Sequence, residues 1–177
     1  MSIARSILPL FLQLLRAKSL LMDATCSIAP CGATQAGNST HWGVPINSKE
    51  TIDAVLALKT WAVVGLGNNP ERAAFGVAKL LQDKGHRIIP VYPRAEVVHG
   101  ETGYKTLSEI PESVDVADCF VNSTLVGKVV DEAIAIGAKA VWLQLDVIDN
   151  EAVARAQAAG LLTVMDRCPA IEYRARA

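Results

Sequence analysis

The residue types best suited to hold a ligand lie in a glycine-rich turn between a predicted strand and a predicted helix. The apolar run Trp61–Val64 has the length of a buried strand, and Gly65–Asn69 (GLGNN) follows it directly. Glycine adopts positive φ angles and lets a ligand approach the backbone closely. The helix is expected to begin with Asn69 as its N-cap and Pro70 at its first position. A strand, a glycine turn and a helix N-terminus together predict a phosphate or pyrophosphate site.

This turn is only part of a dinucleotide-binding fingerprint. The pattern Gly-x-Gly-x-x-Gly would place glycine where the chain has Pro70. A tight turn without a ligand is therefore the alternative interpretation.

The helix after the turn is predicted to end at Gly85, and its apolar positions share one face: Ala74, Val77, Ala78 and Leu81.

Strands and helices alternate along the remaining sequence. Further strands are predicted at Arg87–Tyr92, Val114–Val121, Ala140–Leu145 and Leu161–Met165. Further helices are predicted with Asn47 and Asn150 as N-caps, at Leu125–Ile136 and, briefly, at Thr106–Ile110. Pro90 stands inside the second strand, where proline removes a ladder donor, and this is an objection to that strand.

The alternation predicts an α/β fold. Helices of this length between strands indicate a single Rossmann-like domain, a doubly wound parallel sheet with helices on both faces. In such a sheet the crossovers are right-handed and ligands bind at the carboxyl ends of the strands. The residues that directly follow each strand are therefore the candidates for binding.

Polar and charged residues follow the second and third strands. Tyr92, Pro93 and Arg94 stand where a NAD-binding fold has an acidic residue for the ribose hydroxyls. Arginine there favours a phosphorylated ribose, as in NADP or coenzyme A, over NAD. A solvated loop charge is the alternative interpretation of Arg94. Asn122 and Ser123 follow the third strand, where binding a ligand and capping the next helix both explain short polar side chains.

Three more candidates follow the last two strands. Gln144 stands at the end of the fourth strand. Arg167 is placed to meet a pyrophosphate or, alternatively, to pair with Asp166 or Asp146. Cys168 would lie near a bound thiol or simply pack against the C-terminal tail.

Composition argues against several classes of function. The chain has 177 residues, of which 51% are hydrophobic and 20% charged, so it is globular and long enough for a real core. The formal net charge is −1 without a basic block, which argues against nucleic acid as a partner. We find no apolar run long enough to span a membrane. The cysteines form no metal pattern and are interpreted as reduced thiols of a cytoplasmic protein: Cys26, Cys31, Cys119 and Cys168.

Residues 1–46 are expected to be an extension in front of a folded domain of residues 47–177. The apolar stretch after Arg5 resembles the start of a secretory signal, but Arg16 and Lys18 interrupt it. A poor signal sequence, a surface amphipathic helix and a true translation start at Met22 are the three interpretations, and we favour the latter two. Residues 23–46 are rich in small and polar types and are interpreted as a disordered linker.

Six short motifs occur in a characteristic order: Val63–Leu66, Asn69–Arg72, Ile89–Val91, Asp131–Ala133, Val141–Leu145 and Met165–Pro169. They resemble those of the small stand-alone CoA-binding proteins (YccU-like). These proteins in turn are similar to the nucleotide-binding domain of the succinyl-CoA synthetase α subunit. The resemblance implies a Rossmann-like domain that holds CoA across the switch point of the sheet. It also answers the objection to the second strand, because the family carries a proline there.

The resemblance implies roles for particular residues of this sequence. The glycine turn would cradle the pyrophosphate through Gly65, Gly67, Asn68, Asn69 and Pro70, with Arg72 as a further cofactor-binding residue. Tyr92, Pro93 and Arg94 would face the adenosine and its phosphate, and Asn122 and Ser123 the pantetheine. The same cofactor site is expected to include Gln144, Arg167 and Cys168. The chain departs from the family at Asp146, where glycine is usual, and a carboxylate there would narrow the site or repel an acyl group.

The expected function is binding of coenzyme A or an acyl-CoA by a non-catalytic, regulatory module, with a protein partner still to be identified. A synthetase-type ligase needs a phosphorylatable histidine and a second domain, but the histidines are His41, His86 and His99, all before the last third of the chain. Nothing in the sequence places one of them beside a candidate nucleophile. The alternatives are an NADP-linked oxidoreductase that uses the same site and a redox-responsive module in which Cys168 forms a mixed disulfide with CoA.

Overall fold

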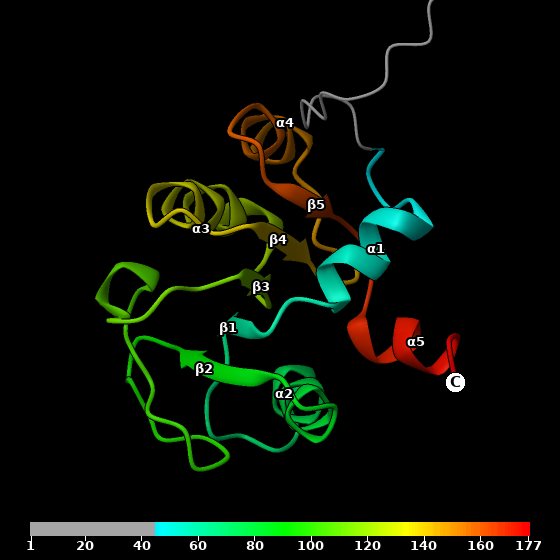
Figure 1. Ribbon diagram of the computed structural model, residues 1–177. Helices are drawn as coiled ribbons and strands as arrows, with labels where there is room; N and C mark the ends of the chain where they lie inside the picture. Colours follow the sequence, from blue (N-terminus) through cyan, green and yellow to red (C-terminus); the bar gives the residue numbers. More distant parts are fainter. Residues whose placement is uncertain (1–44) are drawn as a thin grey trace, which may run out of the picture. The chain divides into compact units, whose positions relative to one another are not determined.

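The computed structural model describes residues 45–177, and the predictions for the segment in front of them lie outside the described residues. Within the described part, five parallel strands form one sheet in the order β2-β1-β3-β4-β5 (Figure 1). They are β1 (Thr60–Val64), β2 (Arg87–Val91), β3 (Val116–Cys119), β4 (Ala140–Leu143) and β5 (Leu162–Val164). The sheet grows in opposite directions from β1, toward β2 and toward β3. A switch-point crevice therefore opens at the carboxyl ends of β1 and β3.

Helices cover both faces of this sheet, which confirms the predicted doubly wound α/β fold (Figure 1). One face carries α1 (Lys49–Leu56), α2 (Ala73–Asp83) and α5 (Pro169–Arg174), and the other carries α3 (Ser123–Ala135), α4 (Asn150–Ala158) and the 3₁₀ turn η1 (Leu107–Glu109). Successive residues of β1 alternate between the faces: Trp61 and Val63 pack with the first group, Ala62 and Val64 with the second. None of the described helices is both long and apolar enough to cross a membrane.

The strand β2 lies at an edge of the sheet, and this position accommodates Pro90. Pro90 stands opposite Val63 in the register of β1 and β2. Its carbonyl oxygen accepts a hydrogen bond from the backbone N–H of Tyr104 at 2.9 Å, on the side away from β1. The N and O atoms of one strand residue point to the same side, so the missing N–H of proline costs no hydrogen bond to β1. The predicted strand is confirmed.

The N-caps of two helices are neighbours of the residues predicted as caps. α1 is capped by Ser48, whose Oγ accepts a hydrogen bond from a backbone N–H of the first helical turn at 3.1 Å. Asn47 has a φ of +62°, and its side chain bonds the backbone C=O and N–H of Met165 at 2.8 and 2.9 Å. Asp149, not Asn150, caps α4. At the start of each helix two neighbouring polar residues fit the cap pattern. At α1 the long-range contact of Asn47 with Met165 leaves Ser48 as the N-cap. At α4 the local backbone conformation selects Asp149.

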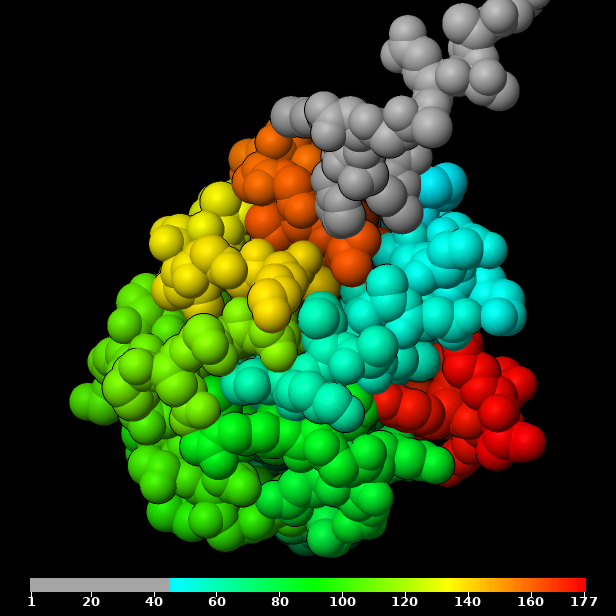
Figure 2. All heavy atoms as spheres, viewed as in Figure 1, coloured from blue at the N-terminus to red at the C-terminus, as the bar shows by residue number. Residues whose placement is uncertain are grey.

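The C-terminal tail forms a helix, α5, that the sequence analysis did not predict. Pro169 occupies its first turn. The hydroxyl of Tyr173 donates a hydrogen bond to the carbonyl oxygen of Leu56 at 3.2 Å, and Nε of Arg176 lies 2.6 Å from Oδ1 of Asp53. Figure 2 shows the cyan surface of α1 directly beside the red surface of α5. The two helices therefore support each other on one face of the sheet.

Gly65→Ala is expected to destabilise the fold more than Gly85→Ala does. Gly65 has a φ of +99°, and a Cβ there would lie 2.5 Å from the carbonyl oxygen of Phe120. Gly85 has a φ of +87°, but open space surrounds its Cβ position. Positive φ costs alanine about 1–2 kcal/mol at either site, and overpacking adds roughly 1–3 kcal/mol at Gly65 alone. Urea denaturation of both variants measures the two losses, and equal losses would contradict the close approach.

Candidate ligand site

The glycine turn forms a longer loop than the sequence predicted, because α2 begins only at Ala73. Asn69 is not its N-cap. Its Oδ1 instead accepts a hydrogen bond from the backbone N–H of Glu71 at 3.0 Å and closes a local turn. Arg72 is the N-cap and makes no side-chain hydrogen bond to the helix. Leu66 is fully buried and anchors the loop 65–72 in the core beyond the end of β1.

A small polar pocket of about 160 Å³ lies on this loop, and we call it the loop pocket. The residues that follow β2 form its opposite wall. Its lining residues are Gly65, Gly67, Asn68, Asn69, Arg72, Tyr92, Arg94 and Glu96. All of these except Glu96 were predicted as cofactor-binding residues, so the structure brings the first two groups of candidates together.

A larger pocket of about 560 Å³ adjoins the loop pocket, and the two share Gly65, Arg72 and Tyr92. We call it the crevice pocket, because it lies where β1, β2 and β3 end and α3 begins. Apolar side chains form much of its wall: Val64, Val91, Phe120, Val121, Leu125 and Val129. The remaining lining residues are the predicted Pro93 and Asn122 together with Lys105, Thr106, Lys128 and Glu132.

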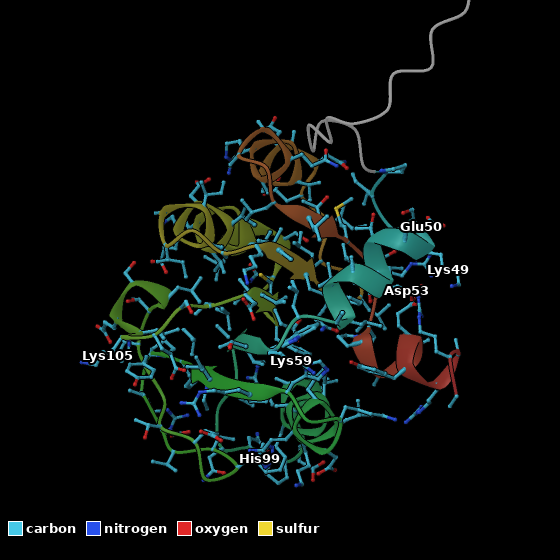
Figure 3. All side chains as sticks on the ribbon, in the orientation of Figure 1. Lys49, Glu50, Asp53, Lys59, His99 and Lys105 are labelled. Carbon is cyan, nitrogen blue, oxygen red and sulfur yellow. The ribbon has the colours of Figure 1, made fainter. Side chains whose placement is uncertain are left out.

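The cationic side chains that line the two pockets differ in whether they form an ion pair. Arg72, Lys105 and Lys128 line the crevice pocket and make no ion pair with any described residue; Lys105 comes from the connection between β2 and η1 (Figure 3). Arg94, in contrast, lies with its Nε 3.4 Å from a carboxylate oxygen of Glu96 and its guanidinium 5.5 Å from the centre of the Tyr92 ring. The hydrogen bond to Tyr92 and the nearby carboxylate raise the pKa of Arg94 above its usual value.

Two predicted site residues close to the pockets line neither of them. Pro70 is one. Ser123 is the other: its Oγ donates a hydrogen bond to the carbonyl oxygen of Asp146 at 3.3 Å and accepts one from the N–H of Ile148 at 2.9 Å. Ser123 thus ties α3 to the connection that follows β4. Asp146 has a φ of +64°, a conformation that glycine prefers and aspartate tolerates.

Gln144, Arg167 and Cys168 also lie outside both pockets. Gln144 is buried and its amide bonds Asp118. Arg167 lines a separate pocket beside α1 and α5. Its guanidinium lies 3.7 Å from a carboxylate oxygen of Glu172, so its ion-pair partner is neither Asp166 nor Asp146. Cys168 is the N-cap of α5 and packs against the core on that face of the sheet.

Sequence reasoning missed four charged lining residues: Glu96, Lys105, Lys128 and Glu132. A signal existed for Glu96, because it follows the second strand closely and an acidic residue in that region is a known ribose ligand in Rossmann folds. Lys105 stands in an irregular connection without a pattern. Lys128 comes from α3, where a polar position between apolar ones predicts only a solvent-facing side chain.

Comparisons with known proteins connect this geometry to a ligand. Residues 59–174 match the CoA binding domain family. The chain is 33% identical over 122 residues to the uncharacterized protein YneT of Bacillus subtilis, and this match spans 68% of this chain and 90% of YneT. It is 36% identical over 81 residues to the alpha subunit of an ADP-forming acetate–CoA ligase of Pyrococcus furiosus, but this match spans 45% of this chain and 18% of that subunit.

A solved structure shows the same arrangement of elements. A hypothetical protein from Pyrococcus horikoshii OT3 is 34% identical and has a TM-score of 0.70, with 80% of this chain and 98% of that one covered. The likeness therefore extends over nearly all of two small proteins, YneT and the P. horikoshii protein. It covers less than a fifth of the ligase subunit.

A buried carboxyl group lies in β3 beside the predicted site residue Gln144. Asp118 is fully buried, and its Oδ1 accepts a hydrogen bond from Nε2 of Gln144 at 2.6 Å. Its Oδ2 has no hydrogen-bond partner among the described residues. Burial raises the pKa of Asp118 to about 7, although the bond from Gln144 acts in the opposite direction. The adjacent thiol of Cys119 is also fully buried, and burial raises its pKa as well.

Asp118→Asn is expected to flatten the pH dependence of stability between about pH 4 and pH 7. The pKa of Asp118 rises from an ordinary 3.8 to about 7 on folding, so the folded protein holds one extra proton in this window. The free energy of unfolding of the wild type therefore falls as pH rises, by up to roughly 1.4 kcal/mol per pH unit from this group, and levels off above the folded-state pKa. Urea denaturation of both proteins over this range measures the difference in slope, and parallel curves would contradict the prediction.

Proposed function

This chain belongs to the CoA binding domain family, and we propose that it binds coenzyme A or an acyl-CoA across the loop pocket and the crevice pocket. We further propose that it holds this ligand without catalysing a reaction on it. The ligand class follows from the family and from the geometry of the two pockets together. The holding role is supported by the contacts of the histidines and by the short stretch shared with the ligase subunit.

The observation that carries the proposal is that a small polar pocket and a larger, mostly apolar one share three lining residues. Coenzyme A has the same division, because a nucleotide with charged phosphates is joined to a long, uncharged pantetheine arm. Backbone donors and arginine on a glycine loop suit the phosphates. Apolar walls with a few polar groups suit the arm. A ligand of this length would lie in both pockets at once.

Particular side chains fit particular parts of such a ligand. Arg72 lines both pockets and makes no ion pair with a described residue, so it is the cation best placed for the pyrophosphate at their junction. Lys105 and Lys128 offer uncommitted charge in the crevice pocket for a further phosphate. Asn122 is placed there to bond an amide of the pantetheine arm.

The described histidines have structural partners, which supports a holding role over a catalytic one. The ring of buried His86 bonds the carbonyl oxygen of Leu58 and the hydroxyl of Tyr173, and burial lowers its pKa. Nε2 of His99 lies 2.9 Å from the carbonyl oxygen of Phe75. The region shared with the ligase subunit is 18% of that subunit. We infer that chemistry on the bound ligand, where it occurs, is supplied by another protein.

Titration calorimetry of the purified protein with CoA is expected to show micromolar binding, near −8 kcal/mol. Arg72→Ala should weaken this binding by about 1.5–3 kcal/mol, the value of a hydrogen bond to a charged group. Arg174→Ala is the matched control, because Arg174 is exposed on α5 and lines neither pocket. Its affinity for CoA should equal that of the wild type.

The same titration with NADPH and NADH separates the alternatives. Binding of NADPH without binding of CoA would refute the proposal and favour an oxidoreductase that uses the crevice. Equal loss of CoA affinity in the two arginine variants would mean that CoA binds away from the pocket junction.

A further inference from the structure

We propose that the carboxylate of Glu96 occupies the loop pocket as an internal competitor, which a phosphate-bearing ligand must displace before it binds. Glu96 would then lower the affinity of the site for such a ligand. The inference rests on the proposed function, because it concerns the same pocket. It goes further in naming a residue of this chain that opposes the ligand.

Both carboxylate oxygens of Glu96 contact groups that a phosphate would use. Oε2 accepts a hydrogen bond from the backbone N–H of Asn68 at 2.9 Å, and Oε1 lies 3.4 Å from Nε of Arg94. A Cβ placed on Gly67 would lie 3.5 Å from Oε2, so the carboxylate rests directly on the glycine turn. The loop pocket therefore already contains an anion, held by a backbone donor and a guanidinium.

This arrangement opposes an incoming phosphate in three ways. The N–H of Asn68 is already used, so the ligand gains that hydrogen bond only after the carboxylate leaves it. The charge of Arg94 is partly neutralised by its neighbour. A phosphate beside an unmoved Glu96 would also experience like-charge repulsion at short range. All three effects disappear when the side chain rotates out of the pocket.

The backbone around Glu96 is held on both sides, so the displacement is a side-chain rotation and not an opening of the whole connection. Before it, the backbone N–H of Tyr92 bonds the carbonyl oxygen of Tyr104 at 2.9 Å. After it, the ring of His99 packs against that of Phe75 of α2, with ring centres 4.1 Å apart and the ring planes tilted by 49°; Figure 3 shows His99 beside that helix. The side chain of Glu96 is itself 29% exposed, which leaves room for it to turn toward solvent.

Calorimetric titration of CoA into wild type, Glu96→Gln and Glu71→Gln tests the proposal. Glu96→Gln keeps the size of the side chain but removes its charge, and we expect roughly tenfold tighter CoA binding, within the range of one charged hydrogen bond. Glu71→Gln is the matched control, because Glu71 lies on the same loop, is exposed and lines neither pocket. It removes the same charge nearby without touching the contact to Asn68. Its CoA affinity should stay within about twofold of the wild type, since surface charges contribute little.

A second variant, Glu96→Ala, removes the competing acceptor altogether and should bind CoA at least as tightly as Glu96→Gln. Unchanged binding in both Glu96 variants would overturn the inference. Weaker binding in both would overturn it as well, and would make Glu96 an acceptor for the ligand, for example for ribose hydroxyls. Equal gains in the Glu96 and Glu71 variants would overturn it too, because a general charge effect would then explain the result. Absence of CoA binding in every variant would refute the proposed function itself, and the inference with it.

Discussion

The candidate site depends on how closely the backbones of β1 and β3 approach each other at Gly65. The N–H of Gly65 bonds the carbonyl oxygen of Val91 in β2, and the N–H of Phe120 bonds the carbonyl oxygen of Val64, both at 2.8 Å. The space that a side chain would fill at Gly65 is taken by the carbonyl group of Phe120. Three strands therefore end at one point, and the connections that leave them diverge. The two pockets lie between these connections, and both include Gly65.

Local patterns in the sequence were sufficient to predict the architecture. They failed where contacts with residues distant in the sequence determine a local structure. The apolar stripe of α2 and the terminator Gly85 follow from spacing within one helix, and both are observed. The true role of Asn47 depends on Met165, which is 118 positions away. The helix α5 is six residues long, which is too short for its sequence to show a clear helical periodicity. Contacts with α1 support it instead. Periodicity reports which face of an element is buried but not which distant backbone group it meets.

The same division applies to the candidate site. Residues that follow β1 and β2 were predicted as a group and do meet in one pocket, because the ends of neighbouring parallel strands must lie close together. Residues after β4 and β5 were assigned to the same site but lie farther along the sheet from the switch point, and they line neither pocket. Strand order, which the sequence does not display, decides this difference. Glu96 was missed for a related reason, since its contact with Asn68 joins two connections 28 residues apart.

The proline in β2 also has a consequence for how molecules of this protein meet one another. Exposed edge strands offer rows of free N–H and C=O groups that invite pairing with another chain. In β2 the outward-facing Pro90 has no N–H to offer, and its carbonyl oxygen is already bonded by Tyr104. The opposite edge, β5, is three residues long. Within the described chain, both margins of the sheet are therefore poor templates for strand addition, and the fold is protected against edge-to-edge aggregation.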